Sequence, residues 1–245
     1  GPIDDFQSLA YVKLSGEIVD ENNNILTNYN GELSSTIFDK EIIRTTLNND
    51  GLSPPINFKT LGESIFKGNI SVVNGKFEFG FVVPKDIRIP VGNGKISFYS
   101  KKDQSIVDQT GYNTDIKIGG INPNAPSDTT GPKATLYMND QSFQNGGVAN
   151  PSPVFIAVLE DENGINTASG IGHDLIGILD GNETSPYIMN DYYETDLDNY
   201  KKGYPNKEAM GKLEFTILNI SKIDKKTVLV IGKFDLARTI GDLSG

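Results

Sequence analysis

The sequence predicts an all-β protein with two tandem β-sandwich domains of the immunoglobulin-like kind. Apolar and polar residues alternate with a period of two in many short runs, and turn residues bound these runs. Long helical periodicity is absent. At 245 residues the chain also exceeds one average domain, which has about 100–150 residues.

The first domain is expected to span residues 1–118. Its hairpin signal is Asn74-Gly75, which lies between two alternating runs and is typical of a turn whose central residues both take positive φ. Pro84 then ends the second run, since proline cannot donate to a strand ladder. Strands of this domain are expected at 11–19, 69–73, 76–83, 95–99 and 115–118.

Residues 119–132 are predicted to be an interdomain linker, because their glycines, prolines and small polar residues cannot build a core. The second domain then covers 133–245, with an atypical tail from about residue 204. Its strands are expected at 134–138, 154–159, 175–179, 212–218 and 227–231.

Charge and composition exclude several classes of function. The chain has 22 basic and 32 acidic residues, a formal net charge of −10, and lacks the clustered lysines and arginines that nucleic-acid binding requires. An anionic membrane surface repels such a chain, and no apolar run approaches the roughly 20 residues of a spanning helix. The absence of cysteine excludes disulfides, thiolate metal sites and a cysteine nucleophile.

The start of the chain allows two interpretations. Gly1-Pro2 fits the remnant of a cleaved expression tag, which would make the sequence a piece of a longer protein, and it equally fits a natural segment. No signal peptide is visible in the sequence.

His173 is the single histidine of the chain. It has no cysteine to activate and no Gly-x-Ser-x-Gly motif beside it, so a structural role in bracing the Gly170–Gly172 turn is favoured over catalysis.

Two acidic patterns resemble calcium ligands only superficially. Asp20-x-Asn22-x-Asn24 imitates the start of an EF-hand loop, but Ile25 and Gly31 stand where the loop needs glycine and a bidentate glutamate. The acidic runs 160–163 and 180–183 both follow apolar strands and could meet at one end of a sandwich, although wet acidic turns are commoner. No metal site or cofactor is therefore predicted.

A third pattern, Asp191-Tyr192-Tyr193-Glu194, places tyrosines beside acids. It suits a binding edge or a sandwich corner equally well. Glycoside hydrolysis by paired carboxylates is disfavoured, because such sites usually lie in an aromatic cleft and the chain has no tryptophan. The sequence predicts no catalytic residue.

Several longer segments, taken in order, resemble the region after the catalytic domain of the PorU family, the gingipain-like cysteine peptidases that act as sortases of type IX secretion in Bacteroidota. The resemblance covers roughly residues 8 to 203. Its segments are 30–33, 37–40, 65–68, 74–77, 81–87, 136–140 with Phe143, 146–147, 161–167, 170–174 and 190–193.

The resemblance implies that the catalytic Cys and His lie in an upstream domain, so no catalytic residue carries over to this chain. It implies a whole protein that removes C-terminal sorting domains from cargo and helps to anchor the cargo at the cell surface. The implied partners are the upstream peptidase domain and an outer-membrane barrel of PorV type, with no direct membrane span. The family's closing His-x-Leu strand and Trp-Asp turn are absent from residues 204–245.

The predicted function is thus a non-catalytic spacer and docking region, exported to the cell surface at the periphery of the outer membrane. The alternative is a free-standing surface adhesin or carbohydrate-binding module that uses a loop end such as Asp191-Tyr192-Tyr193.

Overall fold

The computed structural model describes residues 5–125, 127, 131–150, 152–161, 164–168, 174–178, 182–198 and 209–216. Within these residues the chain is built almost entirely of strands in open sheets, and its one helical element is the short 3-10 turn η1 (Asn190–Tyr192). The prediction of an all-β, sandwich-like fold is confirmed.

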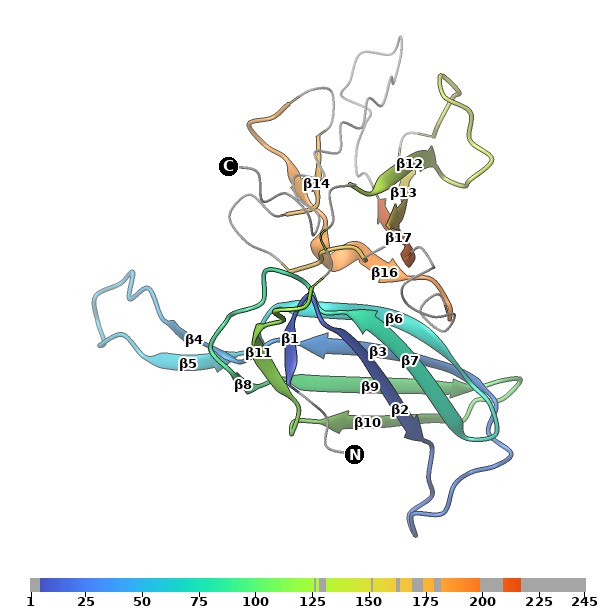
Figure 1. The fold of residues 1–245 in the computed structure, drawn as a ribbon. Coiled ribbons are helices and arrows are strands. Elements are labelled where there is room, and N and C mark those ends of the chain that lie inside the picture. Colours follow the sequence, from blue (N-terminus) through green and yellow to red (C-terminus); the bar gives the residue numbers. More distant parts are fainter. Residues whose placement is uncertain are drawn as a thin grey trace.

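The first half of the chain forms two layers. Strands in the order β10-β9-β3-β6 make one layer, and the two-stranded sheet β2-β7 lies diagonally across it (Figure 1). A small sheet, β1-β11-β8, and a separate hairpin, β4-β5, complete this half. The strands are β1 (Phe6–Ser8), β2 (Tyr11–Glu17), β3 (Gly31–Phe38), β4 (Ile42–Thr45), β5 (Asn57–Thr60), β6 (Ser64–Val72), β7 (Lys76–Val82), β8 (Gly92–Asn93), β9 (Lys95–Lys102), β10 (Asp108–Asn113) and β11 (Lys117–Ile121).

The core of this half lies between the two layers and follows from the period-two alternation. Phe66 of β6 lies with its ring centroid 5.2 Å from that of Phe79 and 4.7 Å from that of Phe81, both on β7. Leu33 and Ile37 project from β3 into the same core and are almost fully buried. Burial of one such side chain contributes about 1.5–3 kcal/mol, so the apolar interior holds the two layers packed together.

The turn at Asn74-Gly75 is confirmed, but the hairpin prediction is wrong beyond it. Asn74 and Gly75 have φ of 53° and 73°, as a tight turn of this type requires. The flanking strands share one bridge, between Val73 and Lys76, and then separate: β6 pairs with β3 and β16, whereas β7 pairs with β2. Both strands carry apolar residues facing the core, which favours packing face to face over pairing edge to edge.

The second half consists of the layer β12-β13-β17-β16 and the short pair β14-β15. The predicted strand at 175–179 is reduced to two paired residues, and the predicted strand at 212–218 begins earlier, as β17. Residues 227–231 lie outside the described residues. The strands are β12 (Lys133–Met138), β13 (Val154–Asp161), β14 (Ile176–Gly177), β15 (Tyr187–Ile188), β16 (Tyr193–Thr195) and β17 (Ala209–Thr216).

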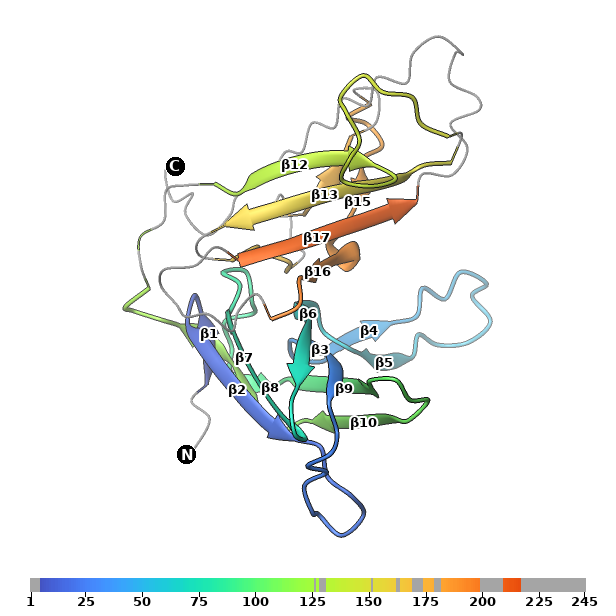
Figure 2. The same ribbon diagram turned by 90° about the vertical axis from the view of Figure 1, so that its right-hand side faces the viewer.

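The four-stranded layer of the first half and the layer β12-β13-β17-β16 of the second half belong to one eight-stranded sheet, in the order β10-β9-β3-β6-β16-β17-β13-β12 (Figure 2). Strand β17 lies inside this sheet, with all eight of its residues in antiparallel register with β13. The connection between the halves is the parallel pairing of β16 with β6, at Thr195 and Gly68.

The predicted linker is partly strand. Residues 119–121 extend β11, which pairs in parallel with β1 and antiparallel with β8, and Asn122 donates its backbone N–H to Ser8 O at 3.2 Å. Strand β12 starts at Lys133, so the described part of the linker without strand structure begins at Asn122. The division into two domains stays a prediction. The two halves share one eight-stranded sheet.

Candidate functional site

The junction between the halves is held by polar contacts on both sides of the β6–β16 pairing. Lys67 of β6 forms an ion pair with Glu194 of β16, with 2.8 Å between Nζ and Oε1. Asp198 accepts hydrogen bonds from the Ser71 backbone N–H at 2.8 Å and from the Ser71 hydroxyl at 2.6 Å. Its own N–H donates to Asn69 O at 3.1 Å. These bonds continue the ladder past the end of β16.

A second set of contacts reaches this junction from the loop that follows β13. Asn166 donates its amide to Asp86 Oδ2 at 2.5 Å, and Thr167 donates its hydroxyl to Ser64 O at 3.3 Å. Both residues are buried, and Asn190 donates to Thr167 O at 3.1 Å. Because buried hydrogen-bonded polar groups fix one geometry, they orient the second half on the first.

The Asp191–Glu194 segment belongs to this junction. Asp191 and Tyr192 lie in η1, while Tyr193 is buried and Glu194 contacts Lys67. Two of its four residues therefore make contacts within the protein, which favours the interpretation as a sandwich corner over that of a binding edge.

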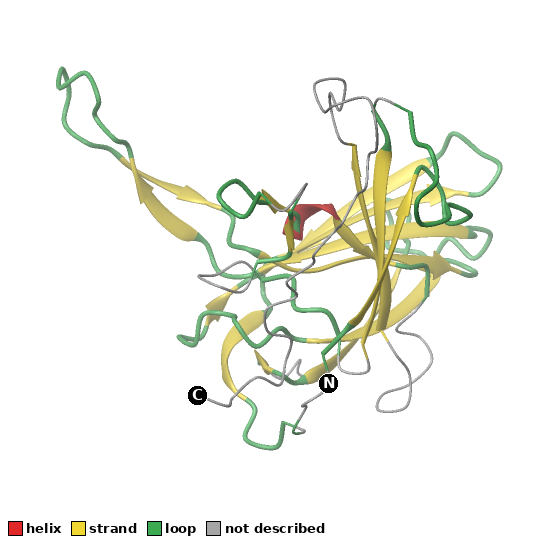
Figure 3. Ribbon diagram, turned by 90° about the horizontal axis from the view of Figure 1, so that it is seen from above, coloured by secondary structure: helices red, strands yellow, loops and turns green. Residues whose placement is uncertain are grey.

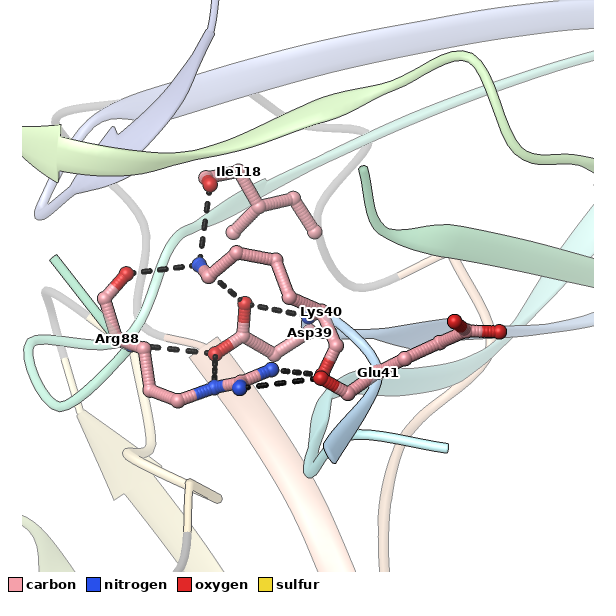
Figure 4. A network of polar contacts seen from close by, with 5 residues as sticks. All are labelled: Asp39, Lys40, Glu41, Arg88 and Ile118. Atoms are coloured by element: carbon pink, nitrogen blue, oxygen red, sulfur yellow. Dashed lines mark hydrogen bonds and ion pairs between the residues drawn. The ribbon is translucent and has the colours of Figure 1, made fainter. Parts of the chain in front are cut away.

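The most buried charged cluster of the described residues joins the end of β3 to β11 (Figure 4). The Asp39 carboxylate lies 2.6 Å from Lys40 Nζ and 3.4 Å from Arg88 Nε. Lys40 Nζ also donates to Arg88 O at 2.7 Å and to Ile118 O at 3.0 Å, and the Arg88 guanidinium donates to the carbonyls of Lys40 and Glu41.

This cluster has a structural role. Lys40 has no spare capacity for substrate chemistry, since its three ammonium donors match three acceptors: the Asp39 carboxylate and two backbone carbonyls. The contacts tie three segments that are distant in sequence, and sequence analysis missed them. The available signal was a charged pair, Asp39-Lys40, directly after an apolar strand.

A projecting hairpin, residues 41–61 with β4 and β5, carries six exposed large apolar side chains. It extends away from the body of the protein in two perpendicular views (Figures 1 and 3). Leu47 and Leu52 near its tip are 83% and 87% exposed. Further exposed apolar side chains along it are Ile43, Ile56, Phe58 and Leu61.

Exposed apolar side chains clustered on a projecting hairpin are unusual for a surface that contacts only water. A two-stranded hairpin that packs on nothing is marginal by itself, and clustered exposed apolar side chains mark interaction sites. The charges of the hairpin balance, since Glu41 and Asp50 stand against Arg44 and Lys59, whereas the whole chain carries −10. The hairpin was not predicted from the sequence, because the apolar residues of its first strand, Ile42 and Ile43, are adjacent and do not alternate with polar residues.

The calcium-like turn is a local hydrogen-bonded loop. Asp20 Oδ1 accepts the backbone N–H groups of Asn22 and Asn24, both at 2.8 Å, and Asp20 Oδ2 accepts the Asn24 amide at 3.1 Å. The bonds from Asn24 hold the pKa of the Asp20 carboxyl below its usual value. The carboxylate is satisfied within the turn, which fits the solvated turn expected from the sequence.

The other predicted positions are described in part. Glu160 pairs with Lys133 at 2.9 Å and Asp161 is buried within β13, but residues 162–163 and 180–181 lie outside the described residues, as do His173 and the Gly170–Gly172 turn. Within the described part of the chain no group of three or more metal-ligating side chains occurs. No helix of that part is long and apolar enough to cross a membrane.

Comparison with known proteins relates this chain to a solved structure. A scan against protein-family models and a search of characterised proteins each find no match. Among solved structures, dimeric latent PorU from Porphyromonas gingivalis matches with 27% identity and a TM-score of 0.50, over 87% of this chain. This chain is similar to part of PorU. The match spans 19% of the PorU chain, about a fifth of its length.

Proposed function

We propose that this chain is the non-catalytic spacer and docking region of a PorU-like sortase of type IX secretion, located after the peptidase domain. The observation that carries the proposal is the similarity to PorU, which extends over 87% of this chain and 19% of that chain. The ordered segments of the sequence resemblance support the same region. This sequence contains no cysteine and so cannot itself supply the thiolate nucleophile of a cysteine peptidase.

In this proposal the whole protein removes sorting domains from exported cargo at the cell surface. The chain contacts the upstream peptidase domain of its own polypeptide and an outer-membrane barrel of PorV type. The shared sheet suits a spacer, because the pairing of β6 with β16 joins the strands of one half to those of the other and holds the halves at a fixed spacing.

The projecting hairpin suits the contact with the barrel. The outer surface of an outer membrane is anionic and repels a chain of formal charge −10. The hairpin carries no net charge and exposes Leu47 and Leu52, so it can approach such a surface without that repulsion.

The test is binding of the full 245-residue chain to a purified PorV-type barrel in detergent micelles, measured by biolayer interferometry. Saturable binding is expected, and Leu47→Asp with Leu52→Asp is expected to weaken it about tenfold or more. Ile106→Asp with Val148→Asp is the matched control, since these side chains are 103% and 97% exposed but lie off the hairpin. Absence of binding by the unaltered chain refutes the docking function, whereas equal loss in both variants refutes the role of the hairpin.

A second test addresses catalysis. The isolated chain is expected to leave a cargo protein with its sorting domain uncut at every pH, because cleavage of this type needs a thiolate. Turnover that survives repurification and is abolished by His173→Ala contradicts the proposal.

A further inference from the structure

Asparagine directly followed by glycine occurs at Asn30, Asn74, Asn93 and Asn145 within the described residues; at Asn163 the pair begins outside them. Asparagine is chemically labile, and a following glycine increases this lability, because glycine has no Cβ atom to hinder attack of its own backbone nitrogen on the asparagine side chain. The attack requires that this nitrogen is free of other bonds and accessible to water. The four described pairs differ in both respects.

Two of the pairs have a glycine nitrogen that is bonded inside the fold. Gly75 N donates to Tyr29 O at 2.8 Å, and Gly94 N donates to Ile116 O at 3.1 Å. Both glycines are buried. Reaction at these pairs therefore requires local opening of the structure first.

The pair at Asn30 is held by the sheet and by its own side chain. Gly31 lies within β3, in register with β6 on one side and β9 on the other, so its backbone groups belong to the ladder. The Asn30 side-chain carbonyl accepts the backbone N–H of Asn74 at 2.8 Å. Neither the nitrogen nor the side chain is available for reaction.

The pair at Asn145 lies in the loop that joins β12 to β13 and extends away from the sheet (Figure 1). Gly147 N donates to Gln144 O at 2.8 Å, and Gly146 has a φ of 82°. These are the features of a type II turn with Asn145 and Gly146 at its two central positions. The bond that closes such a turn uses the nitrogen of Gly147, and Gly146 N has no partner among the described residues.

The tip of this loop is open to water. Asn145 and Gly146 are both exposed, and a Cβ atom built on Gly146 would have no heavy atom within 4 Å. The loop is nevertheless held on both sides of the tip, because Phe143 and Ala149 pack against the core of the second half. A chemical change at the tip therefore leaves β12 and β13 paired.

The turn at Asn74-Gly75 shows that sequence and turn geometry are insufficient to identify the reactive pair. Its asparagine and glycine also occupy the two central positions of a tight turn, which Lys76 N closes by donating to Val73 O at 3.0 Å. The difference is the Tyr29 carbonyl, which comes from a distant loop and occupies the glycine nitrogen.

We propose that Asn145 is a site of spontaneous conversion to aspartate and isoaspartate, with water as the co-reactant. Hydroxide removes the proton of Gly146 N, and this nitrogen forms a bond to Asn145 Cγ. The bond from Cγ to Nδ2 breaks, and the leaving nitrogen takes a proton from water and departs as ammonia, which restores hydroxide and leaves a succinimide ring.

Water then opens the ring at one of its two carbonyl carbons. Addition at Cγ breaks the newly formed bond and gives aspartate, whereas addition at the backbone carbonyl carbon breaks the original peptide bond and gives isoaspartate. Either product adds one carboxylate to a chain of formal charge −10. Ageing of the folded protein thus produces a second, more acidic form with the same strands. This inference is independent of docking through the projecting hairpin, since Asn145 lies outside residues 41–61.

The experiment incubates the full 245-residue chain at mildly alkaline pH and follows each pair by proteolytic digestion and mass spectrometry. Conversion raises the mass of a peptide by about 1 Da. In the folded chain Asn145 is expected to convert about tenfold or more faster than Asn30, Asn74 and Asn93, which need local opening. In urea the four pairs are expected to convert at similar rates, because the unfolded chain offers none of them protection.

Two variants make the test specific. Gly146→Ala is expected to slow conversion at Asn145 about tenfold or more, because the added Cβ hinders the attacking nitrogen. Asn150→Ser, an exposed position in the same loop, is expected to leave the rate at Asn145 unchanged. Unaltered melting temperatures establish that both variants fold.

Hydroxylamine, which cleaves a chain at a succinimide, provides a second measurement and is expected to cut the folded chain after Asn145 before it cuts after Asn74. A rate at Asn145 no greater than that at Asn74 in the folded chain overturns the proposal. Persistence of the difference in urea also overturns it, since neighbouring residues and not the fold would then set the rates.

Discussion

Replacing Asp39 by alanine is expected to destabilise the first half of the protein by about 3–5 kcal/mol. The Asp39 side chain is 4% exposed. It accepts from Lys40 Nζ, the Lys40 backbone N–H at 2.7 Å, the Arg88 backbone N–H at 3.1 Å and Arg88 Nε at 3.4 Å. Asp39→Ala leaves a buried ammonium ion without a counter-charge, which is the costly way to break a buried pair.

Lys40→Met is expected to cost less, about 1–3 kcal/mol. The methionine retains most of the apolar stem, and Asp39 keeps three of its four donors, including the positively charged Arg88. What is lost is one donor to the carboxylate and one donor each to Arg88 O and Ile118 O. The two substitutions therefore differ in cost although they remove the same ion pair.

Native-state hydrogen exchange on β3 and β11 measures both costs, since these strands flank the cluster. Lys13→Ala provides the control: the Lys13–Glu78 pair has a similar length of 2.8 Å, but its side chains are 59% and 53% exposed, and exposed pairs contribute less than about 1 kcal/mol. If Lys40→Met costs as much as Asp39→Ala, the unpaired buried charge does not cause most of the destabilisation and the reasoning is wrong.

Three further predictions concern other parts of the fold. Gly31→Ala is expected to cost about 2 kcal/mol or more in urea unfolding, because its Cβ would overlap the Lys101 carbonyl oxygen, whereas Gly111→Ala is expected to be tolerated; equal losses refute this argument. Asp198→Ala is expected to increase hydrogen exchange along β6 by removing two bonds to Ser71, worth about 1–3 kcal/mol together, and unchanged exchange contradicts a tight junction. Asn24→Ala keeps the backbone N–H bond to Asp20 and removes the side-chain amide bond, so it is expected to raise the pKa of Asp20 part of the way toward its usual value, as read by NMR titration. Because the pKa of Asp20 is lowered in the folded state, the stability that Asp20 contributes is present above its unfolded-state pKa and is lost as the pH falls through its folded-state pKa. An unshifted titration in Asn24→Ala refutes the contribution of the side-chain amide to the lowered pKa.

Local patterns were sufficient to predict about half of the strands, whereas β3 and β10, two of the four strands of the first-half layer, were not predicted. The alternation around Leu14 and the positive-φ turn at Asn74-Gly75 follow from side-chain periodicity and turn chemistry, which neighbouring residues determine. Which strand pairs with which was not predictable in the same way. The separation of β6 and β7 into different sheets depends on the facing rings of Phe66 and Phe79, a packing choice that a turn signal does not contain.

The candidate sites depend on contacts between residues distant in sequence. Asp39 and Arg88 are 49 positions apart, and Ser71 and Asp198 are 127 positions apart, so no spacing motif connects them. The opening between β2 and β10 was also beyond sequence reasoning, because it results from the unequal widths of two sheets. The sequence did indicate that Gly16 lies in an alternating strand, but only the structure brings the Phe77 ring over it.

The β6–β16 pairing has a practical consequence for dividing this protein. A cut within residues 122–132, where sequence alone suggests a boundary, separates β6 from its neighbour across the sheet. The N-terminal piece then exposes the backbone of Gly68 and Ser71 to solvent, and the C-terminal piece exposes β16. Open edges of this kind recruit other strands, so excised pieces are prone to cross-pair or aggregate. If a protease cuts the folded chain at that place, the two fragments should stay paired and elute together from a sizing column.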